Sequence, residues 1–476
     1  MNPTIFRAYD IRGIYDKDFG NEDAKLLGQA FGTYIQNISG PKVVIGHDNR
    51  FSSVPLNDNF VEGLLLSGCD ILDIGLSLTP IIHFSVITQN LDGGIMVTAS
   101  HNPKEFNGFR FDAKKALPIY NDQIQEIRKI AESKSFKNGK GIIHYSDAFP
   151  AYLNNILSKI NLKRKLKVVI DCGNGTSSRF APELFEKLGC EVLPLQCNLD
   201  GDFPVHVPDP EEKINLADSA QLVLSERADL GVGFDADGDR FGIIDEQGQV
   251  YENDKILILL VRQILAKKPG AKIIYDIKSS YLLENEIRRL GGNPQMMQTG
   301  HPYFKIAMEK DPNILLGGEL SGHTFIKDGY FGSDDGLFAA ARILEILSQS
   351  DKEFSHFFDD IPKTSHTEEL RAPCPDDKKF EIVESLKNDF RGNWATVELD
   401  GVRVVFSGTA WALVRASNTS PYLSLRFEAE NDAKLNEIID IVESRLQKYP
   451  VVDISCLANL PGRSPSFQTP KEEHMI

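Results

Sequence analysis

Short apolar segments alternate with helical patterns along most of this chain of 476 residues. A short apolar run, a turn containing glycine and an amphipathic helix in succession are typical of parallel sheets with crossover helices. The pattern predicts strands at residues 42–48, 71–75, 94–99, 166–171, 230–234, 241–245, 272–276 and 315–318, and helices at residues 55–67, 182–188, 255–267, 282–290 and 335–348.

The strand, turn and helix succession begins again near residues 165 and 251, which suggests a triplicated α/β domain although no residue-level repeat proves it. After residue 362 the character changes to a smaller α+β pattern. It predicts strands at residues 401–406, 412–415 and 423–428 and helices at residues 379–389 and 432–448. We therefore expect domains at residues 1–148, 149–249, 250–361 and 362–450, followed by a loosely attached tail at residues 451–476.

Composition narrows the class of protein. Hydrophobic residues make up 41% and charged residues 25% of the chain, as in ordinary globular proteins. With 52 basic and 68 acidic residues, the net charge of −16 argues against a nucleic acid or an anionic membrane as partner. Phosphate could still be bound by locally placed Arg, Lys and backbone N–H groups.

The six cysteines form no CxxC pair, which indicates reduced thiols. The sequence shows no signal-peptide pattern, and its apolar runs are far shorter than the roughly 18 residues that span a bilayer. We expect a soluble, cytoplasmic protein.

A serine stands at the end of the strand predicted at residues 94–99, where residues 98–103 read Thr-Ala-Ser-His-Asn-Pro. Most serines in such places are turn or cap residues. A serine esterase would more often show Gly-x-Ser-x-Gly, which is absent. A serine oxygen that carries phosphate and also binds Mg²⁺ would explain this segment together with an acidic segment further along the chain. Ser100 is therefore a candidate nucleophile.

That acidic segment is Asp-Ala-Asp-Gly-Asp-Arg at residues 235–240. Alternate residues of an extended chain point to one side, so Asp235, Asp237 and Asp239 should converge, with Gly238 permitting a tight turn. Hard oxygen ligands suit Mg²⁺. A solvated acidic turn is the alternative. An EF-hand is disfavoured because Arg240 stands where the calcium loop needs glycine and strands replace the flanking helices.

Two more segments offer polar groups. In Gly-Glu-Leu-Ser-Gly-His at residues 318–323, Glu319, Ser321 and His323 suit vicinal sugar hydroxyls, although such a segment alone is more often just a loop. Residues 415–421 read Arg-Ala-Ser-Asn-Thr-Ser-Pro between two predicted strands. They offer donors suited to a phosphate dianion, from Arg415, Ser417, Asn418 and Thr419. An ordinary turn stopped by proline would explain these residues but leave the arginine without a role.

Together and in this order, the four segments resemble the α-D-phosphohexomutase superfamily. The resemblance extends from Phe-Arg-Ala-Tyr-Asp-Ile-Arg-Gly at residues 6–13 to about residue 448. Residues 98–103 look like the family's phosphoserine loop, 235–240 like its metal loop, 319–323 like its sugar-binding loop and 415–421 like its phosphate-binding loop. The resemblance implies three similar α/β domains with mixed sheets and a smaller C-terminal α+β domain, arranged around a central active-site cleft.

It further implies a reversible isomerisation between hexose 1-phosphate and hexose 6-phosphate. Phosphorylated Ser100 would donate its phosphoryl group to the sugar, and the resulting hexose 1,6-bisphosphate would turn over and return its other phosphoryl group. One Mg²⁺ per chain would be held by Ser100, Asp235, Asp237 and Asp239. Hexose 1,6-bisphosphate would act as activator, and the partners would be small-molecule sugar phosphates. Monomer and dimer are both compatible with the sequence.

Further positions match the family. Lys278 and His301 match candidates for general acid and base, although the residues alone would suggest a surface cation and a loop histidine. Tyr9, Arg12, His101 and Arg240 are implied to contact the substrate. Arg110 stands where the family often has lysine, and we interpret it as electrostatic because arginine is a poor proton shuttle.

The sugar is suggested by Glu-Leu-Ser-Gly-His, which resembles the Glu-Met-Ser-Gly-His of the phosphomannomutase/phosphoglucomutase branch and favours mannose or glucose phosphate. The phosphoglucosamine mutase branch, with Gln in the middle, is the runner-up. A phosphatase is disfavoured because it needs no second phosphate site. A catalytically silent sugar-phosphate-binding protein is disfavoured because Ser100 and the three aspartates are present.

Overall fold

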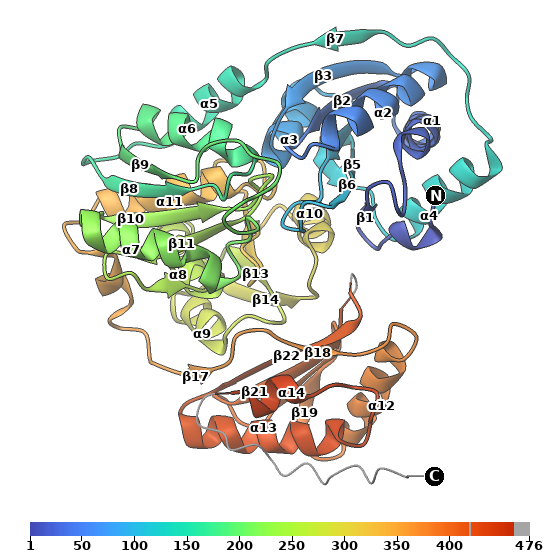
Figure 1. The fold of residues 1–476 in the computed structure, drawn as a ribbon. Coiled ribbons are helices and arrows are strands. Elements are labelled where there is room, and N and C mark those ends of the chain that lie inside the picture. Colours follow the sequence, from blue (N-terminus) through green and yellow to red (C-terminus); the bar gives the residue numbers. More distant parts are fainter. Residues whose placement is uncertain (418–419, 461–476) are drawn as a thin grey trace, which may run out of the picture. The chain divides into compact units, whose positions relative to one another are not determined.

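The computed structural model describes residues 1–417 and 420–460. The chain divides into two compact units, one at Met1–Asp360 and one that begins at Ile361. Figure 1 shows the first unit in colours from blue through yellow to orange and the second in orange and red.

Three repeats of one strand arrangement make up the first unit. In each repeat three neighbouring strands are parallel and a fourth is antiparallel to the last of them. The strands are β2 (Lys42–His47), β3 (Asp70–Leu76), β4 (Gly93–Val97) and β5 (Phe106–Ala113) in repeat 1; β8 (Lys167–Asp171), β9 (Glu191–Leu195), β10 (Leu230–Phe234) and β11 (Phe241–Asp245) in repeat 2; and β13 (Lys272–Asp276), β14 (Asn293–Met297), β15 (Ile314–Gly318) and β16 (Thr324–Ile326) in repeat 3. Their spatial orders are β3-β2-β4-β5, β9-β8-β10-β11 and β14-β13-β15-β16. This identity of order confirms the expected triplication.

Helices connect the parallel strands of each repeat, as βαβ units require. They are α2 (Ser53–Ser67) and α3 (Thr79–Thr88) in repeat 1, α6 (Ala181–Lys187) and α7 (Ala217–Glu226) in repeat 2, and α9 (Tyr281–Arg289) and α10 (His301–Lys310) in repeat 3. The remaining helices of the unit are α1 (Asn21–Ile38), α4 (Asp122–Ser133), α5 (Phe149–Leu157), α8 (Asn253–Lys267) and α11 (Gly336–Ser348). Further strands extend the sheets: β1 (Ile11–Ile14), β6 (Leu117–Pro118), β7 (Ile143–Tyr145) and β12 (Val250–Tyr251).

Burial explains why the central strands read as continuous apolar runs. Every residue of β4, β10 and β11 is buried, as expected for strands of a sheet covered on both faces. In repeat 1 the core is aromatic. Phe31 stacks on Phe111 with ring centroids 4.6 Å apart, and Phe60 stacks on Phe109 at 4.7 Å.

Three of the candidate segments occupy the same place in the three repeats. Each is the connection from the third strand to the antiparallel fourth: the serine loop (residues 98–103) between β4 and β5, the aspartate turn (235–240) between β10 and β11, and the Glu319 loop (319–323) between β15 and β16. A segment fixed at both ends by hydrogen-bonded strands has little freedom, which suits a catalytic site.

The second unit is an antiparallel sheet with helices. Its strands are β17 (Ser365–His366), β18 (Leu370–Pro373), β19 (Ala395–Val397), β20 (Val402–Val405), β21 (Trp411–Ala416) and β22 (Tyr422–Ala429), and its helices are α12 (Lys379–Arg391), α13 (Asp432–Leu446) and α14 (Ser455–Ala458). The sheet order is β17-β22-β21-β20-β19, with β18 also paired to β22. Side chains from α12 and α13, including Leu386, Phe390, Ile438 and Val442, are buried in its core.

The expected loose tail is wrong for residues 451–460. Val452 and Leu457 are buried in the core of the second unit, and Asp453 donates its backbone N–H to Pro373 at 2.9 Å. The burial of these two apolar side chains holds residues 451–460 against the second unit despite the polar residues between them. Residues 461–476 lie outside the described residues.

All the strands and helices that the sequence predicts are present within a few residues. In residues 1–417 and 420–460, no helix has both the length and the apolar character to cross a membrane.

Candidate active site

The serine loop adopts an unusual backbone conformation at its central residue. Ser100 has a φ of 48°, in the left-handed region that few non-glycine residues adopt. Its backbone N–H donates to the Thr98 hydroxyl at 2.8 Å, and its carbonyl accepts from the Arg50 guanidinium at 2.6 Å. The loop is therefore fixed on both sides of the hydroxyl that it presents.

Arg50 holds the whole serine loop. Its guanidinium also donates to the carbonyls of Asn102 and Pro103 at 2.7 and 2.8 Å. On its other edge it pairs with Asp48 at 3.0 Å, and both side chains are fully buried. Asp48 in turn accepts from the Thr98 hydroxyl at 2.8 Å. Because a buried charge pair with satisfied hydrogen bonds is rigid, Arg50 and Asp48 define where Ser100 lies.

The Ser100 hydroxyl reaches the aspartate turn. It donates to Asp235 Oδ2 at 3.0 Å, and His101 Nδ1 lies 3.1 Å from the Ser100 Oγ. Ser100 and Asp235 are 135 residues apart in the chain, so two repeats meet at this bond.

The three aspartates converge, but not as an extended strand. Residues 235–240 form a turn, and Gly238 has a φ of 72°, which glycine adopts without strain. Oxygens of Asp235, Asp237 and Asp239 all lie within 4.8 Å of one another, and the three side chains are buried. Asp237 also accepts from the Thr79 hydroxyl at 2.5 Å. The turn, not strand alternation, brings them together.

The buried carboxylates of this turn repel one another, and a bound cation would offset that repulsion. Burial, together with repulsion from Asp239 and Asp237, raises the pKa of Asp235 well above its ordinary value. Burial and Asp239 raise the pKa of Asp237 to about 6. Although burial acts in the same sense on Asp239, His323 and Arg110 keep its pKa below the ordinary value.

The donor set fits a hard metal ion. Within the described residues, Asp237 Oδ1 and Asp239 Oδ1 are buried and have no hydrogen-bond partner. Buried carboxylate oxygens without partners are costly unless a cation satisfies them. The acidic triad can therefore bind a metal ion.

The Glu319 loop is shaped by neighbours in repeat 3. The Glu319 backbone carbonyl accepts from Asn253 Nδ2 at 2.7 Å, and the Glu319 carboxylate accepts from the Gly300 N–H at 2.6 Å. Burial raises the pKa of Glu319 to about 7. Ser321 and His323 are buried in the same loop.

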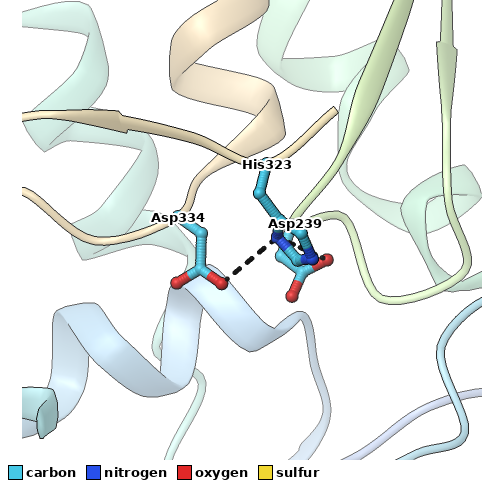
Figure 2. Close-up of side chains that lie close together, drawn as sticks. All are labelled: Asp239, His323 and Asp334. Atoms are coloured by element: carbon cyan, nitrogen blue, oxygen red, sulfur yellow. Dashed lines mark ion pairs between the residues drawn. The ribbon is translucent and has the colours of Figure 1, made fainter. Parts of the chain in front are cut away.

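Arg240 joins the aspartate turn to the Glu319 loop. Its Nε donates to His323 Nε2 at 3.0 Å, and its backbone N–H donates to Asp235 at 3.1 Å. Because His323 Nε2 accepts this bond, a neutral ring carries its proton on Nδ1. Figure 2 shows that His323 lies between Asp239 and Asp334, with Nδ1 3.8 Å and 3.4 Å from their carboxylates.

Arg110 is the centre of a buried charge network. It forms ion pairs with Asp239 and, at 2.6 Å, with Asp334, and it lies 3.0 Å from His301 Nδ1. Burial and the nearby Arg110 hold the pKa of His301 well below its ordinary value. A neutral His301 can accept a proton, while Arg110 supplies fixed positive charge.

The N-terminal residues lie beside these groups. Arg12 donates to Asn102 of the serine loop at 2.7 Å and pairs with Asp10 at 2.6 Å. Tyr9 donates to the Thr299 carbonyl at 3.2 Å, and its ring meets His301 edge-on at 6.0 Å. Lys278, which follows β13, is buried, with its Nζ 3.7 Å from Glu211.

The candidate phosphate loop lies in the second unit. Arg415, on β21, forms an ion pair with Asp400 at 3.0 Å. The arginine therefore has a structural partner even if residues 415–421 are an ordinary turn. Ser417 accepts from the backbone N–H of Ser420 at 3.2 Å. Lys379, which no sequence motif singles out, donates to the Ser420 carbonyl at 2.9 Å. Asn418 and Thr419 lie outside the described residues.

Sequence reasoning missed the residues that support the site. Asp48 and Arg50 follow β2, and Asp334 precedes α11 beside the Asp335 that caps it. The buried Lys305 ammonium lies 3.1 Å from Asp112 and 3.8 Å from Asp334. Charged residues just past the carboxyl end of a buried strand, as in Asp48-Asn-Arg50, were the available signal.

A buried serine bonded to one of three clustered carboxylates, beside fixed arginines, defines a phosphoryl-transfer site. Family models support this conclusion over almost the whole chain. Residues 3–138, 145–248 and 252–365 match the phosphoglucomutase/phosphomannomutase alpha/beta/alpha domains I, II and III, and residues 369–444 match the C-terminal domain. The chain belongs to the phosphoglucomutase/phosphomannomutase family of the α-D-phosphohexomutases, and it is an enzyme of the intramolecular phosphotransferase class.

Individual relatives agree. The chain is 40% identical to the phosphomannomutase/phosphoglucomutase of Pseudomonas aeruginosa over 93% of its own length and 96% of that protein's. It is 37% identical to the phosphoglucomutase of Neisseria gonorrhoeae, covering 94% and 97% of the two chains. A phosphoglucomutase/phosphomannomutase family protein of Burkholderia thailandensis superimposes with a TM-score of 0.89 at 36% identity, covering 95% and 99%.

Proposed function

We propose that this protein interconverts hexose 1-phosphate and hexose 6-phosphate, with mannose, glucose or both as the sugar. One observation carries the proposal: the Ser100 hydroxyl, on a clamped loop, lies 3.0 Å from a carboxylate of the buried aspartate turn. The names of the relatives, phosphomannomutase and phosphoglucomutase, point to the same reaction.

Ser100 is the phosphoryl carrier. In the first half-reaction a sugar hydroxyl attacks the phosphorus of phosphorylated Ser100. The bond from phosphorus to Ser100 Oγ breaks, and the products are hexose 1,6-bisphosphate and the free serine. In the second half-reaction, Ser100 Oγ attacks the other phosphate of the reoriented intermediate. Overall the phosphoryl group has changed position and the enzyme is again phosphorylated.

Proton movement falls to Lys278 and His301. His301 Nδ1 accepts from Arg110, so a neutral His301 can take the proton of the attacking sugar hydroxyl at Nδ1 once substrate replaces this Arg110 contact. Lys278 is suited to donate a proton to the oxygen that leaves in the reverse direction. Arg110 stays charged and stabilises negative charge that develops on the transferring group.

Each unit carries groups that are suited to bind the substrate. Glu319, Ser321 and His323 bind sugar hydroxyls. Tyr9, Arg12, His101 and Arg240 line the reacting side. Arg415, Ser417, Asn418 and Thr419 bind the phosphate that does not react, because a guanidinium with hydroxyl and amide donors suits a dianion. The domain division expected from the sequence, with boundaries near residues 148, 249 and 361, assigns one loop to each domain.

Ser100, Asp235, Asp237 and Asp239 would hold one Mg²⁺. When bound, it supplies positive charge that offsets the charge of the transferring phosphoryl group. Hexose 1,6-bisphosphate serves as activator, since it restores the phosphate on Ser100 whenever the intermediate escapes. Cytoplasmic sugar phosphates are the substrates.

The test uses purified protein, Mg²⁺ and a trace of glucose 1,6-bisphosphate with mannose 1-phosphate, glucose 1-phosphate or glucosamine 1-phosphate. Phosphorus NMR follows the 6-phosphates. Conversion of mannose or glucose phosphate supports the proposal, and faster conversion of glucosamine phosphate would favour the runner-up. Release of inorganic phosphate without any 6-phosphate would indicate a phosphatase. Ser100→Ala should be inactive, and the surface control Ser133→Ala should retain full activity.

A further inference from the structure

Two cysteines of repeat 2 lie in contact with each other. Cys172 follows β8 and Cys197 follows β9, and these strands are parallel neighbours. The two sulfur atoms are 3.3 Å apart. Cys172 is fully buried, and Cys197 is partly accessible.

Both side chains are held in place. Cys197 Sγ lies 3.3 Å from the carbonyls of Ile170 and Leu195. The turns that carry the cysteines are also joined, because Asn174 donates its backbone N–H to Gln196 at 2.7 Å and its side-chain N–H to Asn198 at 2.8 Å. A disulfide has a sulfur–sulfur distance of about 2.05 Å, so a closing movement of about 1 Å is enough to form one.

We propose that Cys172 and Cys197 are a modification site, a dithiol that forms a reversible disulfide with small-molecule disulfides such as oxidised glutathione. The accessible Cys197 thiolate attacks the small disulfide, forms a mixed disulfide and releases one small thiol. The Cys172 thiolate then attacks Cys197 Sγ and displaces the second small thiol. Two protein thiols are oxidised, one small disulfide is reduced, and the two protons leave with the two small thiols.

Burial sets the pace of the second step. It raises the pKa of the Cys172 thiol well above the ordinary value, and the neighbouring Cys197 acts in the same sense. Since the thiolate is the nucleophile, the closing step accelerates as the pH rises.

The disulfide would act on the aspartate turn through residues 172–177. Thr176 donates its backbone N–H to the Ala236 carbonyl at 3.0 Å, and the Ser177 hydroxyl donates to the Asp235 carbonyl at 3.0 Å. The backbones of Gly175 and Ala236 are tightly packed, because a Cβ added at Gly175 would lie 2.8 Å from the Cα of Ala236. Drawing Cys172 toward Cys197 therefore moves the backbone that positions Asp235.

The same turn also reaches the support of the serine loop. The Thr176 hydroxyl accepts from the backbone N–H of Asn49 at 2.9 Å, and Asn49 donates its side-chain N–H to the Asn174 carbonyl at 2.8 Å. Asn49 stands between Asp48 and Arg50. A displacement near 1 Å at catalytic groups can cost about 10²-fold in rate. We expect the oxidised protein to lose mutase activity by at least several-fold, a consequence that rests on the proposed function.

The experiment incubates the full-length protein with oxidised glutathione at several pH values, blocks remaining thiols and maps the peptides by mass spectrometry. The expected result is a cross-linked peptide pair with Cys172 and Cys197, lighter by two hydrogens than the reduced pair and formed faster at higher pH. This readout needs no activity and no variant. Absence of the cross-link under conditions that glutathionylate Cys197 overturns the proposal.

Activity is measured on the same samples before and after dithiothreitol. Wild-type activity should fall on oxidation and return on reduction, whereas Cys197→Ser should keep its activity throughout. Cys456→Ser, at a partly buried thiol of the second unit, is the matched control and should respond like wild type. Equal inactivation of Cys197→Ser, or a complete cross-link with unchanged activity, overturns the link between this disulfide and the aspartate turn.

Discussion

Glu319 is ionisable, buried and held by one backbone N–H, so its substitution by glutamine should stabilise the protein at neutral pH. Its pKa is about 7 in the folded chain, against an ordinary value of 4.5. That difference corresponds to about 3 kcal/mol. Since the folded pKa lies above the unfolded one, folding bears no penalty below pH 4.5, where both states are protonated. The penalty grows between pH 4.5 and 7 and is constant above.

Glu319→Gln removes this dependence but keeps an oxygen that can accept from the Gly300 N–H at 2.6 Å. The variant and wild type should have similar thermal midpoints at pH 4, and the variant should be more stable at pH 8 by up to about 3 kcal/mol. Scanning calorimetry of the metal-free proteins across this range measures the difference. At the same time the variant should bind substrate poorly, because the amide lacks the charge that the proposed sugar contact uses.

Glu246 offers a control with the opposite sign. Burial acts to raise its pKa, but hydrogen bonds from the Ser355 hydroxyl and backbone N–H, at 2.5 and 3.2 Å, outweigh it and hold the pKa below the ordinary value. Its stabilisation is present above pH 4.5 and lost as the pH falls through its folded pKa. Glu246→Gln should therefore be less stable than wild type at pH 8. If Glu319→Gln were also less stable there, burial would not be what perturbs Glu319.

Four further outcomes test the site. Ser100→Ala should lower mutase turnover by about 10³-fold or more, and a phosphorylated Ser100→Ala protein would contradict the assignment of the carrier. Arg50→Lys should lower kcat by about 10²-fold, because an ammonium cannot reproduce the planar contacts to three carbonyls; unchanged kcat would mean that the serine loop holds itself. Asp334→Asn should destabilise the protein by about 3–5 kcal/mol in urea unfolding, because it leaves Arg110 with one buried partner fewer. Mg²⁺ at about 100 times its Kd should stabilise wild type by about 2.7 kcal/mol relative to chelator, and Asp237→Asn should lose most of that gain; superimposable melts would contradict a metal site.

Much of the fold could be predicted from the sequence because buried parallel strands are visible as short apolar runs. The run at residues 230–234 has no polar side chain, residues 273–275 are apolar, and the structure buries both strands almost entirely. Two other strands carry no such signal. β14, at the edge of its sheet, reads Asn-Pro-Gln-Met-Met and is half exposed, and β5, which lies between β1 and β4, interrupts its apolar alternation with Asn107 and Arg110. Both strands exist because partners hold them, not because their own pattern demands it.

The candidate site was predictable where a motif concentrates polar groups and not where a single residue acts at a distance. Three aspartates within six residues were expected to converge, and they do, although a turn brings them together where an extended strand was expected. The charged residues around Arg50 and Asp334 mark polar strand ends but do not indicate what these two side chains contact. Their roles arise from contacts with Ser100, 50 residues away, and with Arg110, 224 residues away, and no window of sequence contains both partners.

The three repeats show why one fold position can supply three kinds of chemistry. Each functional segment leaves a buried parallel strand and returns along an antiparallel partner, so its backbone is fixed while its side chains are free to differ. Repeat 1 uses that position for a hydroxyl, repeat 2 for carboxylates and repeat 3 for a carboxylate with an imidazole. The same fixation forces like charges into a dry interior, which is why the pKa values of Asp235, Asp237 and Glu319 are raised. Stability lost in this way before metal and substrate arrive is recovered when they bind, and it makes the folded protein respond to the ligands that its reaction requires.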